Sequence, residues 1–245
     1  MLKNYLTTGL RNLWKHRGYS FINIVGLAVG IAACLLLLIV VQHELSYDTH
    51  HPDVDRLYRI VRSTTGTSGE PHYSFQTFGP LAPALEETFP EVENAIRLFR
   101  TSGYLISGEK SFRGQLCATD PDVFDVLGLD IISGDPETVF AEPFAMFVTE
   151  QTAKRHFGDE DPMGKVLTMN SRYLPGDFVI RGVIADHPPT SHLRFEALTA
   201  TVPKNRFTDL LWGGWRSQSD WRQVDTYARL KPGTDPGDLE QKLST

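Results

Sequence analysis

The longest apolar segment of the chain runs from Tyr19 to Val41 and carries no formal charge. At a rise of about 1.5 Å per residue, an α-helix over this segment would be about 35 Å long, enough to cross a hydrocarbon core of roughly 30 Å with some tilt. The pattern therefore predicts a membrane-spanning helix near the N-terminus, over residues 19–41.

Two other interpretations of this segment are a cleaved signal peptide and a lipoprotein signal. The apolar region of a signal peptide is roughly 7–15 residues long, and this segment is longer. The sequence Ile31-Ala32-Ala33-Cys34 resembles a lipobox, but further apolar residues follow the cysteine, from Leu35 to Val41. Cleavage there would leave these residues in the lipid, so a retained span is the favoured interpretation.

Charged residues flank the span asymmetrically. Those before it are all basic, and those that first follow it are acidic: Lys3, Arg11, Lys15 and Arg17, then Glu44, Asp48, Asp53 and Asp55. The positive-inside rule predicts a cytoplasmic leader over residues 1–18 and an exported domain over residues 42–245.

In the leader, Leu2, Leu6, Leu10, Leu13 and Trp14 recur at helical spacing. They indicate an amphipathic helix in the cytoplasmic interface, or a simple flanking anchor.

One face of the predicted span carries small residues. Gly26, Gly30 and Cys34 lie four positions apart, and Asn23 lies close to the same face. Small residues at this spacing let a second helix approach closely, and an asparagine can form a hydrogen bond across the contact. Glycine is common in membrane spans, so the spacing also fits chance. We favour a helix-packing face made of these four residues.

The exported part alternates short strand and helix patterns, which predicts an α+β fold. Polar residues 45–55 are expected to extend the helix by a turn or two before it breaks near Pro52. Strands are expected at 57–62, at two or three places within 95–117 separated by Ser102-Gly103 and Gly108-Glu109, and at 145–149, 166–169, 178–185, 195–201 and 224–230. Short helices are expected at 81–89, 121–127, 150–157 and 204–211, and after the Asp235-Pro236 cap. Two lobes are expected, with about 92–140 inserted as a separate unit.

Composition narrows the function further. The chain of 245 residues has a net charge of −6, and the leader contributes +4, so the remainder carries −10. This charge argues against nucleic-acid binding. The two cysteines, Cys34 and Cys117, lie in the span and far along the exported part, so no disulfide is expected.

Motifs for catalysis, cofactors and metals are missing or incomplete. Residues 158–166 resemble a phosphate-binding loop but have the wrong spacing, and Val166 replaces the hydroxyl residue. Acidic clusters at 120–122 and 159–161 lack the glycine of a calcium loop. The histidine pairs His50/His51 and His187/His192 lack supporting ligands at recognised spacings, so turn and cap roles are favoured over metal binding. We expect no catalytic residue, no cofactor and no metal site.

Seven segments together resemble MacB/FtsX-type ABC transporter permeases. They include residues 1–37, the following segment QHELSYDTHHPDVDRLYRIV, the segment VTEQTAKRHFGDEDPMGKVL, the segment FVIRGVIADHPPTSHLRFEAL and the terminal YARLKPGTDPGDLEQKL. The resemblance covers essentially the whole chain. It implies a MacB-like periplasmic core domain of two mixed α/β subdomains in the bacterial inner membrane. It also implies a non-catalytic permease subunit for export or mechanotransmission, with a separate cytoplasmic ATPase and a second permease copy or half as partners.

The chain also departs from this family, whose members carry at least three further spans after the periplasmic domain. The resemblance therefore implies that the chain is the N-terminal piece of a longer permease, or a truncated product. A second hypothesis is a single-pass, membrane-anchored periplasmic sensor or binding module. A membrane-anchored exported enzyme is disfavoured, because the motifs for catalysis are missing.

Overall fold

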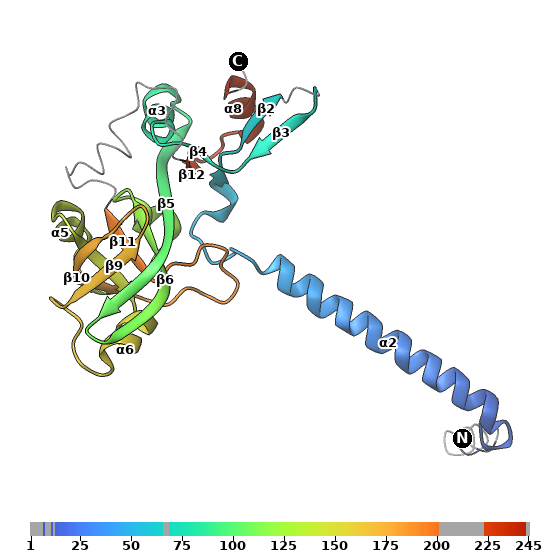
Figure 1. Ribbon diagram of the computed structural model, residues 1–245. Coiled ribbons are helices and arrows are strands. Elements are labelled where there is room, and N and C mark those ends of the chain that lie inside the picture. The colour runs from blue at the N-terminus through green and yellow to red at the C-terminus, as the bar shows by residue number, and fades with distance from the viewer. Residues whose placement is uncertain (1–6, 8–10, 12, 66–68, 201–222, 244–245) are drawn as a thin grey trace. The chain divides into compact units, whose positions relative to one another are not determined.

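The computed structural model of the protein describes residues 7, 11, 13–65, 69–200 and 223–243 (Figure 1). The chain divides into two compact units, Met1–Tyr47 and Asp48–Thr245. The elements, in chain order, are α2 (Arg17–Leu45), η1 (Val54–Arg56), β1 (Leu57–Arg59), β2 (Arg62–Thr65), β3 (Pro71–Ser74), β4 (Thr77–Phe78), α3 (Leu81–Thr88), β5 (Val92–Ser107), β6 (Lys110–Thr119), α4 (Val123–Leu127), β7 (Ile131–Gly134), α5 (Pro136–Ala141), β8 (Ala145–Thr149), α6 (Glu150–Phe157), β9 (Val166–Ser171), β10 (Gly176–Ile184), β11 (Ala197–Ala200), β12 (Gln223–Leu230) and α8 (Pro236–Leu243).

Helix α2 contains the whole predicted span and has no buried residue. Its most apolar window has a mean hydropathy of 3.1, so its length and composition suffice to cross a membrane. The predicted continuation of the helix beyond Leu45 is wrong. The Ser46 hydroxyl donates to the His43 carbonyl at 2.7 Å, and Asp48 has a φ of 57°. A left-handed residue cannot continue a right-handed helix, so the path turns here. Most of the leader, residues 1–18, lies outside the described residues.

The second unit is built on a ten-stranded mixed sheet in the order β1-β12-β5-β6-β11-β8-β10-β7. Strand β4 pairs with β12, and β9 pairs with both β10 and β5. The pairs β8–β10 and β6–β11 are parallel, and the other pairs are antiparallel. Strands β2 and β3 form a separate hairpin. Short helices surround this sheet, so the predicted α+β class is confirmed.

Strand β5 runs through the whole unit and contributes to four apolar clusters. Its first residues, Val92 and Ala95, pack with α3 and α8, and Ile96 packs in a cluster that contains Phe147. Near its other end, Leu105 packs with residues of β8, β9 and β10. In Figure 1, α3 and α8 lie at one end of β5, and β9, β10 and α6 lie at the other. One strand therefore belongs to the cores at both ends of the unit.

The predicted break of this strand at Ser102-Gly103 is wrong. Gly103 pairs with Gly114 of β6, and the hairpin turns only after Ser107. A side chain at Gly103 would place its Cβ 2.3 Å from the carbonyl oxygen of Asn170 in β9. The glycine therefore allows the third strand to approach closely, a common use of glycine inside a strand.

The predicted helices at 81–89, 121–127, 150–157 and after Asp235 are confirmed as α3, α4, α6 and α8. Helix α6 begins where the Thr149 hydroxyl accepts from the Thr152 N–H, and it ends at Gly158, which has a φ of 68°. These are the usual start and stop signals of a helix. Helix α5 and strand β7 were not predicted. The predicted helix at 204–211 lies outside the described residues.

Candidate functional site

The segment that follows α2 in sequence is anchored inside the second unit through Asp48. Its backbone N–H donates to the carbonyl of Thr190 at 3.0 Å, and its Oδ1 accepts from the backbone N–H of His192 at 3.0 Å. Its Oδ2 lies 2.5 Å from Nδ1 of His192. Burial alone would raise the pKa of Asp48, but these contacts with His192, followed by the charge of His51, hold the pKa below its ordinary value. The carboxylate is therefore charged at neutral pH.

His192 extends this anchor to the sheet. Its Nε2 lies 2.7 Å from the hydroxyl of Tyr227 on β12. Because a carboxylate only accepts, Nδ1 carries the proton that points at Asp48. Burial raises the pKa of Tyr227 to about 12, so its hydroxyl stays protonated. Tyr227 is only 4% exposed. The chain of groups Asp48–His192–Tyr227 is therefore suited to hold the segment in place and not to attack a substrate.

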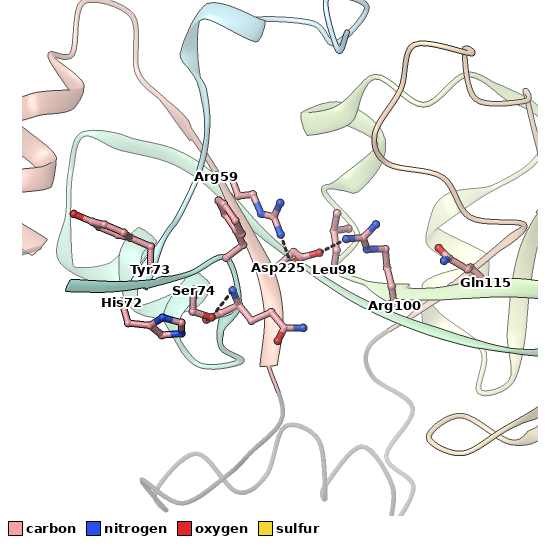
Figure 2. A pocket seen from close by; sticks show the side chains of 10 residues that line it. Arg59, His72, Tyr73, Ser74, Leu98, Arg100, Gln115 and Asp225 are labelled. Carbon is pink, nitrogen blue, oxygen red and sulfur yellow. Dashed lines mark hydrogen bonds and ion pairs between the residues drawn. The ribbon is translucent and has the colours of Figure 1, made fainter. Parts of the chain in front are cut away.

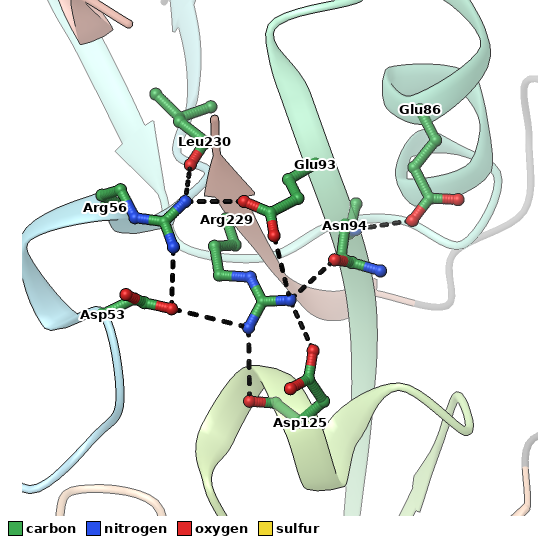
Figure 3. Close-up of polar contacts among 9 residues, drawn as sticks. Asp53, Arg56, Glu86, Glu93, Asn94, Asp125, Arg229 and Leu230 are labelled. Carbon is green, nitrogen blue, oxygen red and sulfur yellow. Dashed lines mark hydrogen bonds and ion pairs between the residues drawn. The ribbon is translucent and has the colours of Figure 1, made fainter. Parts of the chain in front are cut away.

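A second anchor surrounds Arg229 of β12 (Figure 3). Its guanidinium lies 2.5 Å from a carboxylate oxygen of Asp125, 3.5 Å from Glu93 and 3.8 Å from Asp53. Arg56 bridges Asp53 at 2.8 Å and Glu93 at 2.6 Å. We call these five residues the Arg229 cluster. It ties η1 and the residue before it to β5, α4 and β12.

The Arg229 side chain is 7% exposed, so the cluster is partly shielded from water. Its Nε atom is buried and has no hydrogen-bond partner among the described residues. In such a setting, removing one member leaves uncompensated charge, which is costly. The cluster therefore fixes the position of the segment from Asp53 to Arg56.

A cavity of about 570 Å³ lies beside the same strand, between β3, β5 and β12 (Figure 2). Arg59 and Arg100 approach Asp225 from two sides, each with one N–O distance of 2.7 Å. The Arg59 guanidinium also lies 4.9 Å from the ring centre of Phe75. Two guanidinium groups share one carboxylate, which leaves one positive charge in excess. The described lining is therefore suited to a small anionic group.

The residues predicted from the sequence lie on α2. Asn23, Gly26, Gly30 and Cys34 are exposed, and a Cβ added at Gly26 or Gly30 would meet nothing within 4 Å. Their role in helix packing stays a prediction. Cys34 and Cys117 are free, as expected for cysteines without a disulfide.

Sequence reasoning named Asp48 and Asp53 only as charges that follow the span, and His192 only as one of a histidine pair. It did not single out the other residues of the two anchors or those of the cavity. Asp225 and Arg229 are charged residues among the buried residues of β12. A charge in a buried strand is rare unless it is paired. That pattern was the available signal. The partners of these residues, and of Asp48, lie too far away in sequence to be read from spacing.

Comparisons with known proteins give one family and several solved structures. Residues 20–245 match the family model described as MacB-like periplasmic core domain. A domain described as part of a permease protein from Porphyromonas gingivalis aligns with a TM-score of 0.65 at 23% identity, over 79% of this chain and 81% of that one. No curated protein matches the sequence.

Two further solved structures share the fold. The periplasmic region of MacB from Actinobacillus actinomycetemcomitans aligns with a TM-score of 0.53 at 18% identity, over 77% of this chain and 80% of that one. The extracellular domain of the noncanonic ABC-type transporter YknZ from Gram-positive bacteria aligns with a TM-score of 0.52 at 11% identity, over 76% of this chain and 87% of that one. At these identities the likeness concerns the fold alone.

Proposed function

Because this chain belongs to the family of MacB-like periplasmic core domains, we propose that it is a mechanical component of an ABC transporter permease, powered by a separate cytoplasmic ATPase. The observation that carries the proposal is the pair of anchors that follow the candidate membrane helix. Asp48 is held by His192, and Asp53 and Arg56 are held by the Arg229 cluster. A device that transmits movement needs the segment that receives the force to be fixed firmly to its own domain.

The anchors end on strand β12, which carries both Tyr227 and Arg229. Strand β12 pairs with β5 from Asp225 to Leu230, and β5 reaches the far end of the unit. Force applied to the segment from Asp48 to Arg56 would therefore enter the paired strands β12 and β5 of the sheet and not a surface loop. Rigid, hydrogen-bonded elements of this kind carry coupling between distant sites.

The same proposal assigns an orientation and partners. Residues 1–18 lie in the cytoplasm, residues 19–41 cross the bacterial inner membrane, and the domain from residue 42 lies in the periplasm, as the charges flanking the span favour. The face formed by Asn23, Gly26, Gly30 and Cys34 packs against another membrane helix, from a second permease copy or half. The subunit itself is not an enzyme.

Orientation is tested by labelling cysteines in whole cells with a membrane-impermeant maleimide. The background chain carries Cys34→Ser, and Cys117 is buried and does not react. Tyr73, which is 62% exposed, is replaced by cysteine as the reporter of the domain. We expect labelling of Tyr73→Cys in intact cells and of Lys15→Cys only after permeabilisation. The reverse pattern contradicts the proposed orientation.

Coupling to an ATPase is tested with the chain expressed in its native membrane, together with any ABC-type ATPase that a neighbouring gene encodes. We expect the two to copurify, and His192→Ala to reduce transport-linked ATP hydrolysis while copurification is kept. Glu160→Gln, which removes an exposed ion pair with Lys165, is the matched control and should change neither. Repeated absence of any ATPase from the purified complex argues against the proposal.

A second candidate function is a membrane-anchored periplasmic binding module, and the cavity lined by Arg59, Arg100 and Asp225 favours it. Such a module would bind an anionic ligand without any ATPase. Arg100→Ala would then abolish binding of small carboxylates, measured by calorimetry, whereas the mechanical proposal requires no ligand there.

A further inference from the structure

We propose that Asp48, His50 and His51 form a binding site for a divalent transition metal ion such as Zn²⁺. One ligand atom from each residue can be chosen so that all three lie within 4.8 Å of one another. Imidazole nitrogens and a carboxylate oxygen are the donor set that zinc takes in proteins. The sequence spacing alone favoured turn and cap roles for these histidines, so this site goes against that expectation.

The orientation of His51 is the first argument. Its Nδ1 lies 2.8 Å from the carbonyl oxygen of Leu127, and a carbonyl only accepts, so Nδ1 carries the proton. The lone pair of the ring is therefore on Nε2. Histidines that bind metals are usually held in this way, with the other ring nitrogen donating to a backbone carbonyl or a carboxylate.

The second argument is that the Nε2 lone pair of His51 has no partner. This atom is buried and makes no hydrogen bond among the described residues, and the residue is only 7% exposed. A buried polar atom without a partner is costly and calls for an explanation. A metal ion beside it would provide the missing partner.

The separation between ligand atoms is the third argument. Two ligands that stand about 2.1 Å from a tetrahedral zinc ion lie roughly 3.4 Å apart. Nε2 of His51 and Oδ1 of Asp48 lie 3.8 Å apart. This distance is too long for a hydrogen bond. A small rotation of either side chain would bring the two atoms to the separation expected around a tetrahedral zinc ion.

The remaining ligands complete an open site. The ring of His50 lies 4.1 Å from that of His51, centre to centre, and His50 is exposed, so an ion can enter from solvent. The backbone N–H and Nδ1 of His192 hold the Asp48 carboxylate from behind. Three protein ligands leave a fourth position for water or for a further ligand. The site goes beyond the proposed function, because a permease needs no metal at this place.

The test uses the full chain in detergent, free of affinity tags and stripped with a chelator that is then removed. Equilibrium dialysis against Zn²⁺ alone is expected to load one ion per chain, and Co²⁺ is expected to give a visible absorption band of a low-coordinate site. His50→Ala should weaken zinc binding at least about 100-fold, since even the loss of an indirect contact costs 10–100-fold. The matched control is His72→Ala, another exposed histidine on strand β3, and it should bind as the parent does.

A second measurement follows folding. The variant is at His50 and not at His51, because His51 is buried and its replacement can unfold the domain. His50 is exposed, so the metal-free melting temperature of His50→Ala should equal that of the parent. Zinc should raise the melting temperature of the parent and not that of His50→Ala. Equal zinc affinity in the parent and in His50→Ala overturns the site, as does a parent that loads no zinc. Either result leaves the permease proposal intact, because copurification with an ATPase is measured without zinc.

Discussion

Oδ2 of Asp48 and Nδ1 of His192 lie 2.5 Å apart although 144 positions separate the two residues in the chain. This contact brings the segment that leaves α2 against the loop before β11. We expect Asp48→Asn and His192→Ala each to lower the free energy of unfolding by about 1.5 kcal/mol, the usual cost of losing a hydrogen bond to a charged group. Urea denaturation in the presence of a chelator measures the change.

The interaction energy of Asp48 with His192 is measured with the double variant Asp48→Asn/His192→Ala. If the two residues interact as the distance indicates, the double variant should be less destabilised than the sum of the two single variants. Additive effects would mean that the contact contributes nothing by itself. Glu160→Gln serves as the surface control, with an expected change below about 0.5 kcal/mol.

Arg229 is expected to be the most sensitive charged residue of the domain. Arg229→Ala leaves the carboxylates of Asp53, Glu93 and Asp125 facing one another with Arg56 as their cation. The free energy of unfolding should fall by about 1.5–3 kcal/mol, the usual range for lost hydrogen bonds to charged groups, because the arginine is buried but its carboxylate partners are partly exposed. Arg229→Met keeps much of the side-chain volume but lacks the charge. It should lower the free energy of unfolding as much as Arg229→Ala does. A loss below about 1 kcal/mol would show that the cluster does not fix the segment.

His156 is expected to make the domain less stable in mild acid. Burial, and after it the charges of Arg155 and Lys110, hold the pKa of His156 below its ordinary value of 6.5. As the pH falls through 6.5, the unfolded chain takes up a proton that the folded protein does not, so the free energy of unfolding decreases. The loss stops only when the pH reaches the lower pKa of the folded state.

His156→Phe removes this proton uptake and keeps an aromatic ring at this position. In the parent, the rings of His156 and Phe112 pack edge to face, with their centres 5.1 Å apart. Between about pH 7.5 and about pH 5.5, the variant should lose less stability than the parent, by no more than about 1.4 kcal/mol per pH unit. His187, which is half-buried, also has a pKa lowered mainly through burial, so a residual slope should remain. Identical slopes for parent and variant would exclude His156 as a contributor.

The small-residue face of α2 gives a prediction about association. Gly26→Leu together with Gly30→Leu should abolish close packing with a second helix, because the added side chains keep the two backbones apart. Association is measured by cross-linking in native membranes. Ala28→Leu places a leucine on another face of the helix and should leave association unchanged. Equal cross-linking in all three chains would remove this face from the proposal.

How far the sequence predicts this fold depends on how local the cause of each element is. Helix α6 was predictable because its start and stop, Thr149 and Gly158, adjoin it. Gly103 was mistaken for a turn because the strand that needs it, β9, comes more than sixty positions later. The two anchors were not predicted for the same reason, because their partner residues are distant in the sequence. Nothing near Asp48 indicates His192, and nothing near Arg56 indicates Arg229.

The membrane helix was easier to predict than the fold of the exported domain. The span could be placed from composition alone, because the pattern of Tyr19–Val41 needs no knowledge of the rest of the fold. Its boundaries shifted by a few residues, to Arg17 and Leu45, since a helix continues until its hydrogen bonds are interrupted. Whether Gly26 and Gly30 meet a partner depends on a second helix, which no property of this helix alone decides.

Strand β5 determines how this domain can be recombined with those of its relatives. Val92 and Ala95 belong to the cluster with α3 and α8, and Leu105 belongs to the cluster with β8, β9 and β10. A chimaera that takes one end of the domain from another permease must therefore match β5 on both sides of the junction. A library of shuffled halves joined within β5, or at the turn after Ser107, should therefore yield few folded proteins. Either junction divides both clusters, because Val92 packs with Ala228 and Leu230, and Leu105 packs with Met146 and Leu167.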